Sequence, residues 1–214
     1  MSKISLKHSG GNVVSLNSPT SAPASADVAF KLPNADGSVG QFMKTDGSGN
    51  LSFDAAGGGK ILQVVQTVKT DVVSRGGSSG QDALAAISGF SVDITPSATS
   101  SKILVLVNIK QGSTSFGYAR YQLYRDSTPI YLGDTVSGKT SLSSFNNVDN
   151  DYGMNFVTEN FLDSPNTTSQ ITYQVYWGGR TDSGKIAYLN RTSHDSGGYA
   201  VRTASSITAM EVAA

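Results

Sequence analysis

The stretch Phe90-Ser91-Val92-Asp93-Ile94-Thr95-Pro96 shows a clear two-residue periodicity. Its apolar and polar residues alternate, as in a β-strand with one buried face. The strand should end at Thr95-Pro96, because proline lacks the backbone N–H that a central strand donates. Residues 102–109 (KILVLVNI) follow a short polar connection and are apolar on both faces. We therefore expect residues 102–109 to form a central strand buried on both sides.

Similar strand patterns surround this pair. Runs of β-branched and aromatic residues, separated by turn residues, recur through the second part of the chain. About eight or nine such strands in one domain favour a β-sandwich or jelly roll. Residues 81–87 are the one stretch where we expect a short helical turn. The other expected strands cover residues 61–68, 118–125, 129–132, 154–161, 171–177, 186–190 and 206–212.

The first part of the chain has a different character. Residues 1–56 hold three of the six prolines and no long apolar segment. They predict two short hairpins, one around residues 9–12 and one around residues 46–50, joined by a linker-like stretch. Isolated hairpins are marginal in water, so this part should need a partner surface. We expect residues 1–56 to be an extended attachment arm, 57–60 a glycine-rich joint, and 61–214 a jelly-roll-like β-sandwich.

The composition excludes several classes of protein. The 214 residues carry 16 basic and 16 acidic side chains, which argues against nucleic acid as a partner. The longest bulky apolar run, residues 103–107, is far too short to span a membrane, and no signal peptide is visible. The absence of cysteine removes disulfides and thiolate metal sites. Two histidines and two glutamates supply little acid–base chemistry, so we expect no enzyme, cofactor or metal site.

Three local patterns resemble catalytic or metal sites, and each has a simpler interpretation. Residues 46–50 mimic the start of an EF-hand loop, but Leu51 stands where glycine is required, so a hairpin turn is favoured. Residues 147–151 (NVDND) offer several oxygens; a calcium site stays open there, although a solvated loop is favoured. His194 adjoins Asp195, but no nucleophile elbow accompanies the pair. His8, beside a predicted turn, should face solvent.

Tyrosine and arginine gather in one region of the chain. Both residue types are favoured at binding surfaces, and exposed aromatic rings could stack on sugars. Alternate members of a strand can equally be core residues, and this second interpretation is favoured. Two matches to the glycosylation pattern, at Asn166 and Asn190, are expected to be incidental. The clustered residues are Tyr118, Tyr121, Tyr124, Tyr131, Arg120 and Arg125.

Parts of the chain resemble a known group of proteins. Residues 30–53 (FKLPNADGSVGQFMKTDGSGNLSF) are similar to a segment common in tail-fibre and other virion proteins of bacteriophages, especially marine ones. The second part is similar to a β-domain of the same proteins at residues 93–105, 124–126, 188–191 and 205–212. The resemblance implies a compact jelly-roll-like domain, a homotrimer, displayed on the outer surface of the particle and often involved in host attachment.

Two functions remain open at this point. The protein is either a short tail fibre or tip that contacts a host surface glycan or protein, or a capsid decoration protein (a cement protein or head fibre). In both cases residues 1–56 would dock on neighbouring tail or capsid proteins through backbone hydrogen bonds. Host recognition, if present, should use the polar loops at residues 136–151 and 192–199, because binding residues concentrate on loops of rigid scaffolds.

Overall fold

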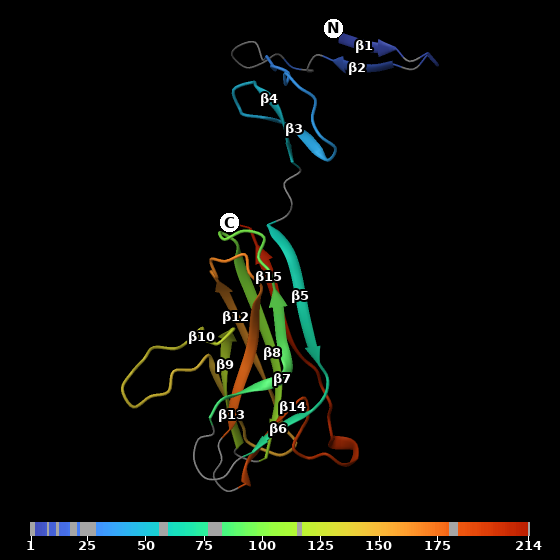
Figure 1. Ribbon diagram of the computed structural model, residues 1–214. Helices are drawn as coiled ribbons and strands as arrows, with labels where there is room; N and C mark the ends of the chain where they lie inside the picture. The colour runs from blue at the N-terminus through green and yellow to red at the C-terminus, as the bar shows by residue number, and fades with distance from the viewer. Residues whose placement is uncertain are drawn as a thin grey trace. The chain divides into compact units, whose positions relative to one another are not determined.

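The structure is a computed structural model, and it describes residues 3–7, 9–11, 13–17, 21, 29–55, 60–76, 83–114, 117–179 and 184–213 (Figure 1). The chain divides into two compact units, Met1–Gly57 and Gly58–Ala214. Nearly all the regular structure is β-strand. The described residues contain no helix with the length and apolar character that a membrane crossing requires. His8 and residues 57–59 of the expected joint at 57–60 lie outside the described residues.

The first unit contains the two predicted hairpins. β1 (Lys3–Lys7) pairs with β2 (Val13–Asn17), and β3 (Gln41–Thr45) pairs with β4 (Leu51–Ala55). The EF-hand-like residues form the turn between β3 and β4, where Asp46 accepts hydrogen bonds from the backbone N–H groups of Ser48 and Asn50. The turn interpretation of residues 46–50 is thus confirmed.

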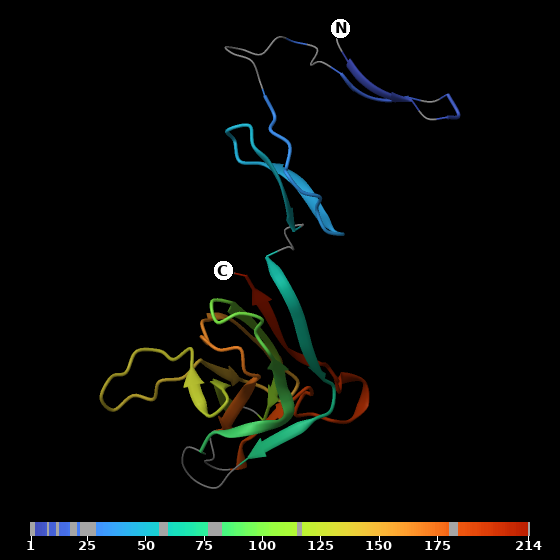
Figure 2. The same ribbon diagram turned by 45° about the horizontal axis from the view of Figure 1, so that its top comes forward.

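The second unit is a sandwich of two antiparallel sheets. Figure 1 labels most of its strands; Figure 2 shows the same unit turned, with the yellow β10–β11 connection projecting from the sandwich in both views. One sheet has the order β10-β9-β13-β7, with β11 also paired to β9; the other has the order β5-β15-β8-β14-β6, with β12 also paired to β8. The strands are β5 (Ile61–Lys69), β6 (Val73–Gly76), β7 (Ala85–Ile94), β8 (Lys102–Ser113), β9 (Gly117–Arg125), β10 (Thr128–Ile130), β11 (Ser144–Val148), β12 (Met154–Asp163), β13 (Ile171–Gly179), β14 (Ile186–Leu189) and β15 (Ser205–Val212).

The strand pairing is nested from the ends of the domain inward. β5 pairs with β15, β7 with β13, β8 with β12, and β9 with β10 and β11. This is the pattern of one long hairpin folded across two sheets, and it is the connectivity of a jelly roll. The all-β, jelly-roll-like fold expected from the sequence is therefore confirmed.

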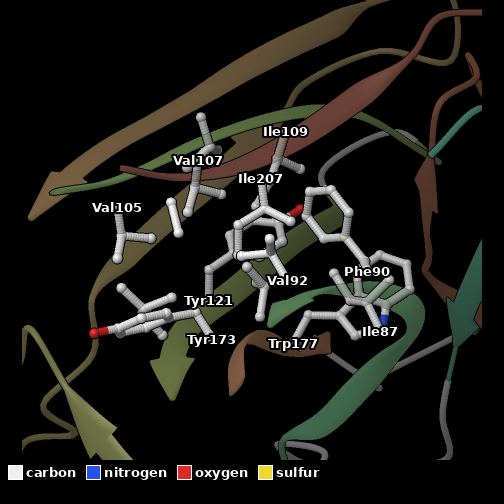
Figure 3. Packing of buried hydrophobic residues seen from close by; sticks show 14 of the residues in the cluster. Ile87, Phe90, Val92, Val105, Val107, Ile109, Tyr121, Tyr173, Trp177 and Ile207 are labelled. Carbon is white, nitrogen blue, oxygen red and sulfur yellow. The ribbon is translucent and has the colours of Figure 1, made fainter. Parts of the chain in front are cut away.

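The core lies between the inner faces of the two sheets. Figure 3 shows Val105, Val107, Ile109 and Ile207 of one sheet facing the side chains of the other. These positions alternate along β8 and β15, because successive side chains of a strand point to opposite faces. Large rings from the second sheet fill the space opposite them. The fully buried side chains there include Tyr121, Tyr173, Trp177 and Phe90.

The outer face of the six-stranded sheet differs from the sequence expectation. β8 is central in its sheet, as predicted, and Ile103, Val105, Val107 and Ile109 are buried. The intervening residues Leu104 and Leu106 are only half-buried, so the strand is not buried on both sides. A two-layer sandwich covers one face of each sheet, and the described strands of this unit form only these two layers. Within this unit, the apolar residues on the outer face therefore have no sheet packed over them.

Two local predictions were wrong. The expected helical turn at residues 81–87 is strand from Ala85 onward, because Ala85 and Ala86 pair with Trp177 and Tyr176 of β13. The predicted loop at residues 136–151 contains β11, whose Val148 is buried. In both cases the pairing partner, rather than the intrinsic preference of the residues, determines the local structure.

The two glutamates of the chain are both buried in the sandwich but differ in their partners. Glu211 of β15 accepts hydrogen bonds from Ser97 Oγ (2.6 Å), Ser97 N (2.7 Å) and Gln63 Nε2 (2.6 Å). Burial by itself would raise the pKa of Glu211, but these bonds outweigh burial and lower it to about 2. Glu159 of β12 has one side-chain oxygen without a hydrogen bond among the described residues. Burial raises the pKa of Glu159.

Candidate functional site: an aromatic cluster at one end of the sandwich

Two connections meet at one end of the sandwich. One joins β11 to β12 and carries Tyr152; the other joins β14 to β15 and carries His194 and Tyr199. β12 begins opposite Gly112, near the end of β8, and β14 pairs there as well. Lys60 and Ala213, which are hydrogen-bonded to each other, lie at the opposite end, near the start of β8. In Figure 1 the red β14–β15 connection is at the lower right, away from the C label. We call the end with Tyr152 and Tyr199 the distal end.

Local hydrogen bonds hold each connection in place. The Asn150 side-chain oxygen accepts from the backbone N–H of Tyr152 (3.0 Å), which closes a tight turn before β12. The Thr192 hydroxyl donates to the carbonyl of His194 (2.8 Å) and accepts from the N–H of Val201 (3.2 Å). The two connections are tied together by a bond from His194 N to the carbonyl of Asp151 (2.8 Å).

Three rings form the cluster. The Tyr152 and His194 rings have centroids 4.6 Å apart, and Tyr152 and Tyr199 meet edge to face at 6.1 Å. Tyr152 is 58% exposed and Tyr199 is 76% exposed, and they line a hollow of about 340 Å³. Exposed tyrosines offer large apolar area together with a polar hydroxyl. The arrangement is suited to binding an apolar or ring-shaped group from solution.

The charged groups beside the cluster are paired with one another. Asp195 binds Arg191 (2.9 Å) and Arg202 (2.5 Å). The hydrogen bond from Arg202, together with the charge of Arg191, holds the pKa of Asp195 below its ordinary value. The carboxylate is therefore directed at two guanidinium groups. The His194–Asp195 pair noted in the sequence does not form a histidine–carboxylate hydrogen bond of the kind that a catalytic triad uses.

The calcium candidate at residues 147–151 is arranged as part of this turn. The Asn147 side-chain amide donates to Asp149 (3.0 Å), and the Asp151 carbonyl accepts a hydrogen bond from the backbone N–H of His194. Among the residues that the structure describes, no group of three or more His, Cys, Asp or Glu side chains is positioned to hold a metal. Asn190, one of the two glycosylation matches, is fully buried; its side-chain amide donates to the carbonyls of Lys69 and Asp71. Its role is structural.

The predicted tyrosine–arginine cluster does not form one surface. Tyr121 is in the core, and Arg125 binds Asp163 between the sheets (2.8 Å). Tyr118 and Tyr124 lie on the opposite face of β9, where Tyr124 packs against Tyr176 (4.0 Å). Strand alternation explains this division, and it confirms the core interpretation for Tyr121. The distal rings Tyr152 and Tyr199 were not singled out from the sequence; the signal available was an aromatic residue in or beside each of two long polar loops.

Comparison with known proteins gives weak structural similarities. No family model matches the sequence, and no curated protein matches it. Among solved structures, infectious bursal disease virus Gt strain has a chain with 12% identity and a TM-score of 0.41, covering 98% of this chain and 46% of that one. The Gx strain gives 13% identity and a TM-score of 0.37, covering 76% and 44%. The virus's VP2 subviral particle gives 15% identity and a TM-score of 0.35, covering 71% and 37%. The chain thus spans less than half the length of these viral chains.

Proposed function

We propose that this chain is a structural protein of a bacteriophage particle, most specifically a short tail fibre or tip that contributes to host attachment. The observation that carries the proposal is the distal end of the sandwich. The two connections that meet there contain residues 149–151 and 192–199 of the two segments expected to recognise a host, and they present exposed Tyr152 and Tyr199 beside a hollow. Such a group of rings on a rigid scaffold is suited to a cell-surface glycan or protein.

The first unit supports the attachment role. Residues 29–55 of this unit expose several large apolar side chains, because one short hairpin buries little apolar surface by itself. A neighbouring tail or capsid protein would cover them. The exposed side chains are Phe30, Leu32, Val39, Phe42 and Met43. The same feature would serve a capsid decoration protein, which is the alternative role, and the number of copies per particle separates the two.

The test is an adsorption assay with matched variants. Tyr152→Ala with Tyr199→Ala should reduce adsorption of particles to host cells at least tenfold, because the cluster loses both exposed rings. Leu132→Ala is the control: Leu132 is 46% exposed, but it lies in the β10–β11 connection outside both segments expected to recognise a host. Normal adsorption by the double variant would reject the attachment role and favour capsid decoration.

We also propose that the protein is not an enzyme; cleavage of host polysaccharide or peptidoglycan by the purified chain would overturn this.

A further inference from the structure

The outer face of the six-stranded sheet carries a continuous apolar row. Four strands lie side by side there in the order β5, β15, β8, β12. Their pairing aligns Val64 with Met210, Met210 with Leu104, and Leu104 with Leu162. Val64 and Leu162, at the two ends of the row, are 55% and 49% exposed. Such a row across four strands is a contiguous patch, whereas scattered exposed apolar residues are ordinary.

Uncharged polar side chains continue this face. The next two aligned rows hold Gln66, Thr208, Leu106 and Asn160, then Val68, Ser206, Asn108 and Thr158. Several of them line a hollow of about 340 Å³. The side-chain oxygen of Asn108 is shielded from solvent and accepts no hydrogen bond from the described residues. A shielded acceptor of this kind costs free energy unless a donor reaches it.

Charge is confined to the ends of the face. On β8 the outward residues between Lys102 and Lys110 are Leu104, Leu106 and Asn108. A nucleic acid, a lipid headgroup or an acidic peptide would find no opposite charge along these rows. Amide and hydroxyl groups both donate and accept hydrogen bonds, so a surface built from them can satisfy a copy of itself. These features favour one occupant, a second copy of the same chain, as in most oligomers of soluble proteins.

The size of the face is consistent with that occupant. Four strands at their usual spacing and a length of about seven residues span roughly 20 Å by 20 Å, or about 400 Å². One side of a standard interface buries about 800 Å², of which the apolar centre is only a part and a polar rim is the rest. This area is thus large enough for the centre of an interface between copies. It extends from the row Val64 to Leu162 to the row Val68 to Thr158.

We propose that the protein self-associates through this outer face, with the row Val64–Met210–Leu104–Leu162 at the centre of the contact and a donor from the neighbouring copy at Asn108. The contact also supplies the layer that the apolar outer residues of β8 lack among the strands of their own unit. The proposal does not depend on the virion role, and it can fail while that role stands.

The test is the mass of the full chain in solution by light scattering. The wild-type chain should have a mass that is a multiple of 22.3 kDa at micromolar concentration. Leu162→Asp and Val64→Asp, placed on different strands, should each raise the dissociation constant about 30-fold or more, because a buried charge replaces a central apolar contact. Leu132→Asp is the control, since Leu132 is 46% exposed but lies in the β10–β11 connection.

Circular dichroism and urea unfolding check that each variant is folded. A wild-type chain that stays monomeric, or an oligomer that survives both Leu162→Asp and Val64→Asp, overturns the proposal. A dimer or trimer that dissociates in these two variants, but not in Leu132→Asp, supports it. A loss of adsorption in the Tyr152→Ala, Tyr199→Ala variant tests host attachment at the distal end, and it does not test self-association through this face.

Discussion

The inner and outer faces of the six-stranded sheet are built by the same strands, yet their surroundings differ. On β8, Ile103, Val105 and Ile109 point inward and are fully buried, while Leu104 and Leu106 point outward and are half-buried. The inner face is covered by the second sheet of the same domain. The outer face carries one apolar row beside two rows that are mainly polar, and its own unit places no further sheet over it. The sandwich thus covers one of the two apolar faces of β8, and the proposed contact between copies would cover the other.

The largest difference between the faces should appear when side chains are truncated. Ile109→Ala removes a fully buried side chain from the inner face and should cost about 3–4 kcal/mol of unfolding free energy, through lost burial and an unfilled cavity. Leu106→Ala, on the outer face, should cost about 1 kcal/mol or less in the monomer. Urea unfolding at submicromolar concentration measures both. Equal losses for the two variants would contradict the difference between the faces.

A smaller effect is expected at Glu211, whose carboxylate faces inward from β15. Glu211→Gln should lower stability by about 1–2 kcal/mol at neutral pH, because the ionised group accepts several hydrogen bonds. The pKa of Glu211 is lowered from 4.5 to about 2, so the wild type gains stability above pH 4.5 and loses it as pH falls toward 2. The advantage of wild type over Glu211→Gln should shrink over that interval in acid-unfolding curves. A constant difference would contradict the assignment.

The smallest effect, with the opposite sign, is expected at Glu159 on the inner side of β12. Burial raises the pKa of this carboxyl, so its ionisation opposes folding, and this cost appears as pH rises above the ordinary value of 4.5. Glu159→Gln should therefore stabilise the protein by about 1 kcal/mol at neutral pH and have little effect in acid. Unfolding curves at the two pH values check this. Destabilisation at neutral pH would show that the ionised Glu159 is well satisfied.

Much of the fold could be predicted from the sequence because strand periodicity is local. The alternation in residues 90–94 and the apolar run in residues 102–109 predicted β7 and β8 directly. β11 was missed because its residues, SFNNV, carry little β-branched character and sit in a polar stretch. Its register on β9, opposite residues 117–121, depends on the tertiary fold.

The candidate sites were less accessible to prediction. The segments at residues 136–151 and 192–199 could be chosen as loops, but the contact between Tyr152 and His194 depends on where β12 and β14 meet the end of β8. The apolar row on the outer face likewise depends on strand order: Val64, Met210 and Leu162 come from three strands far apart in the chain. Periodicity predicts which face a residue occupies, whereas only the register predicts its neighbours.

The claim that a second copy covers the outer face can be tested most directly by thiol accessibility. The chain contains no cysteine, so Leu162→Cys and Leu132→Cys each introduce a single thiol at positions of similar exposure, 49% and 46%. As protein concentration rises from nanomolar to micromolar, maleimide labelling of Leu162→Cys should slow at least about tenfold, because association buries that position. Labelling of Leu132→Cys should stay constant. Equal and concentration-independent labelling of both thiols would contradict the account.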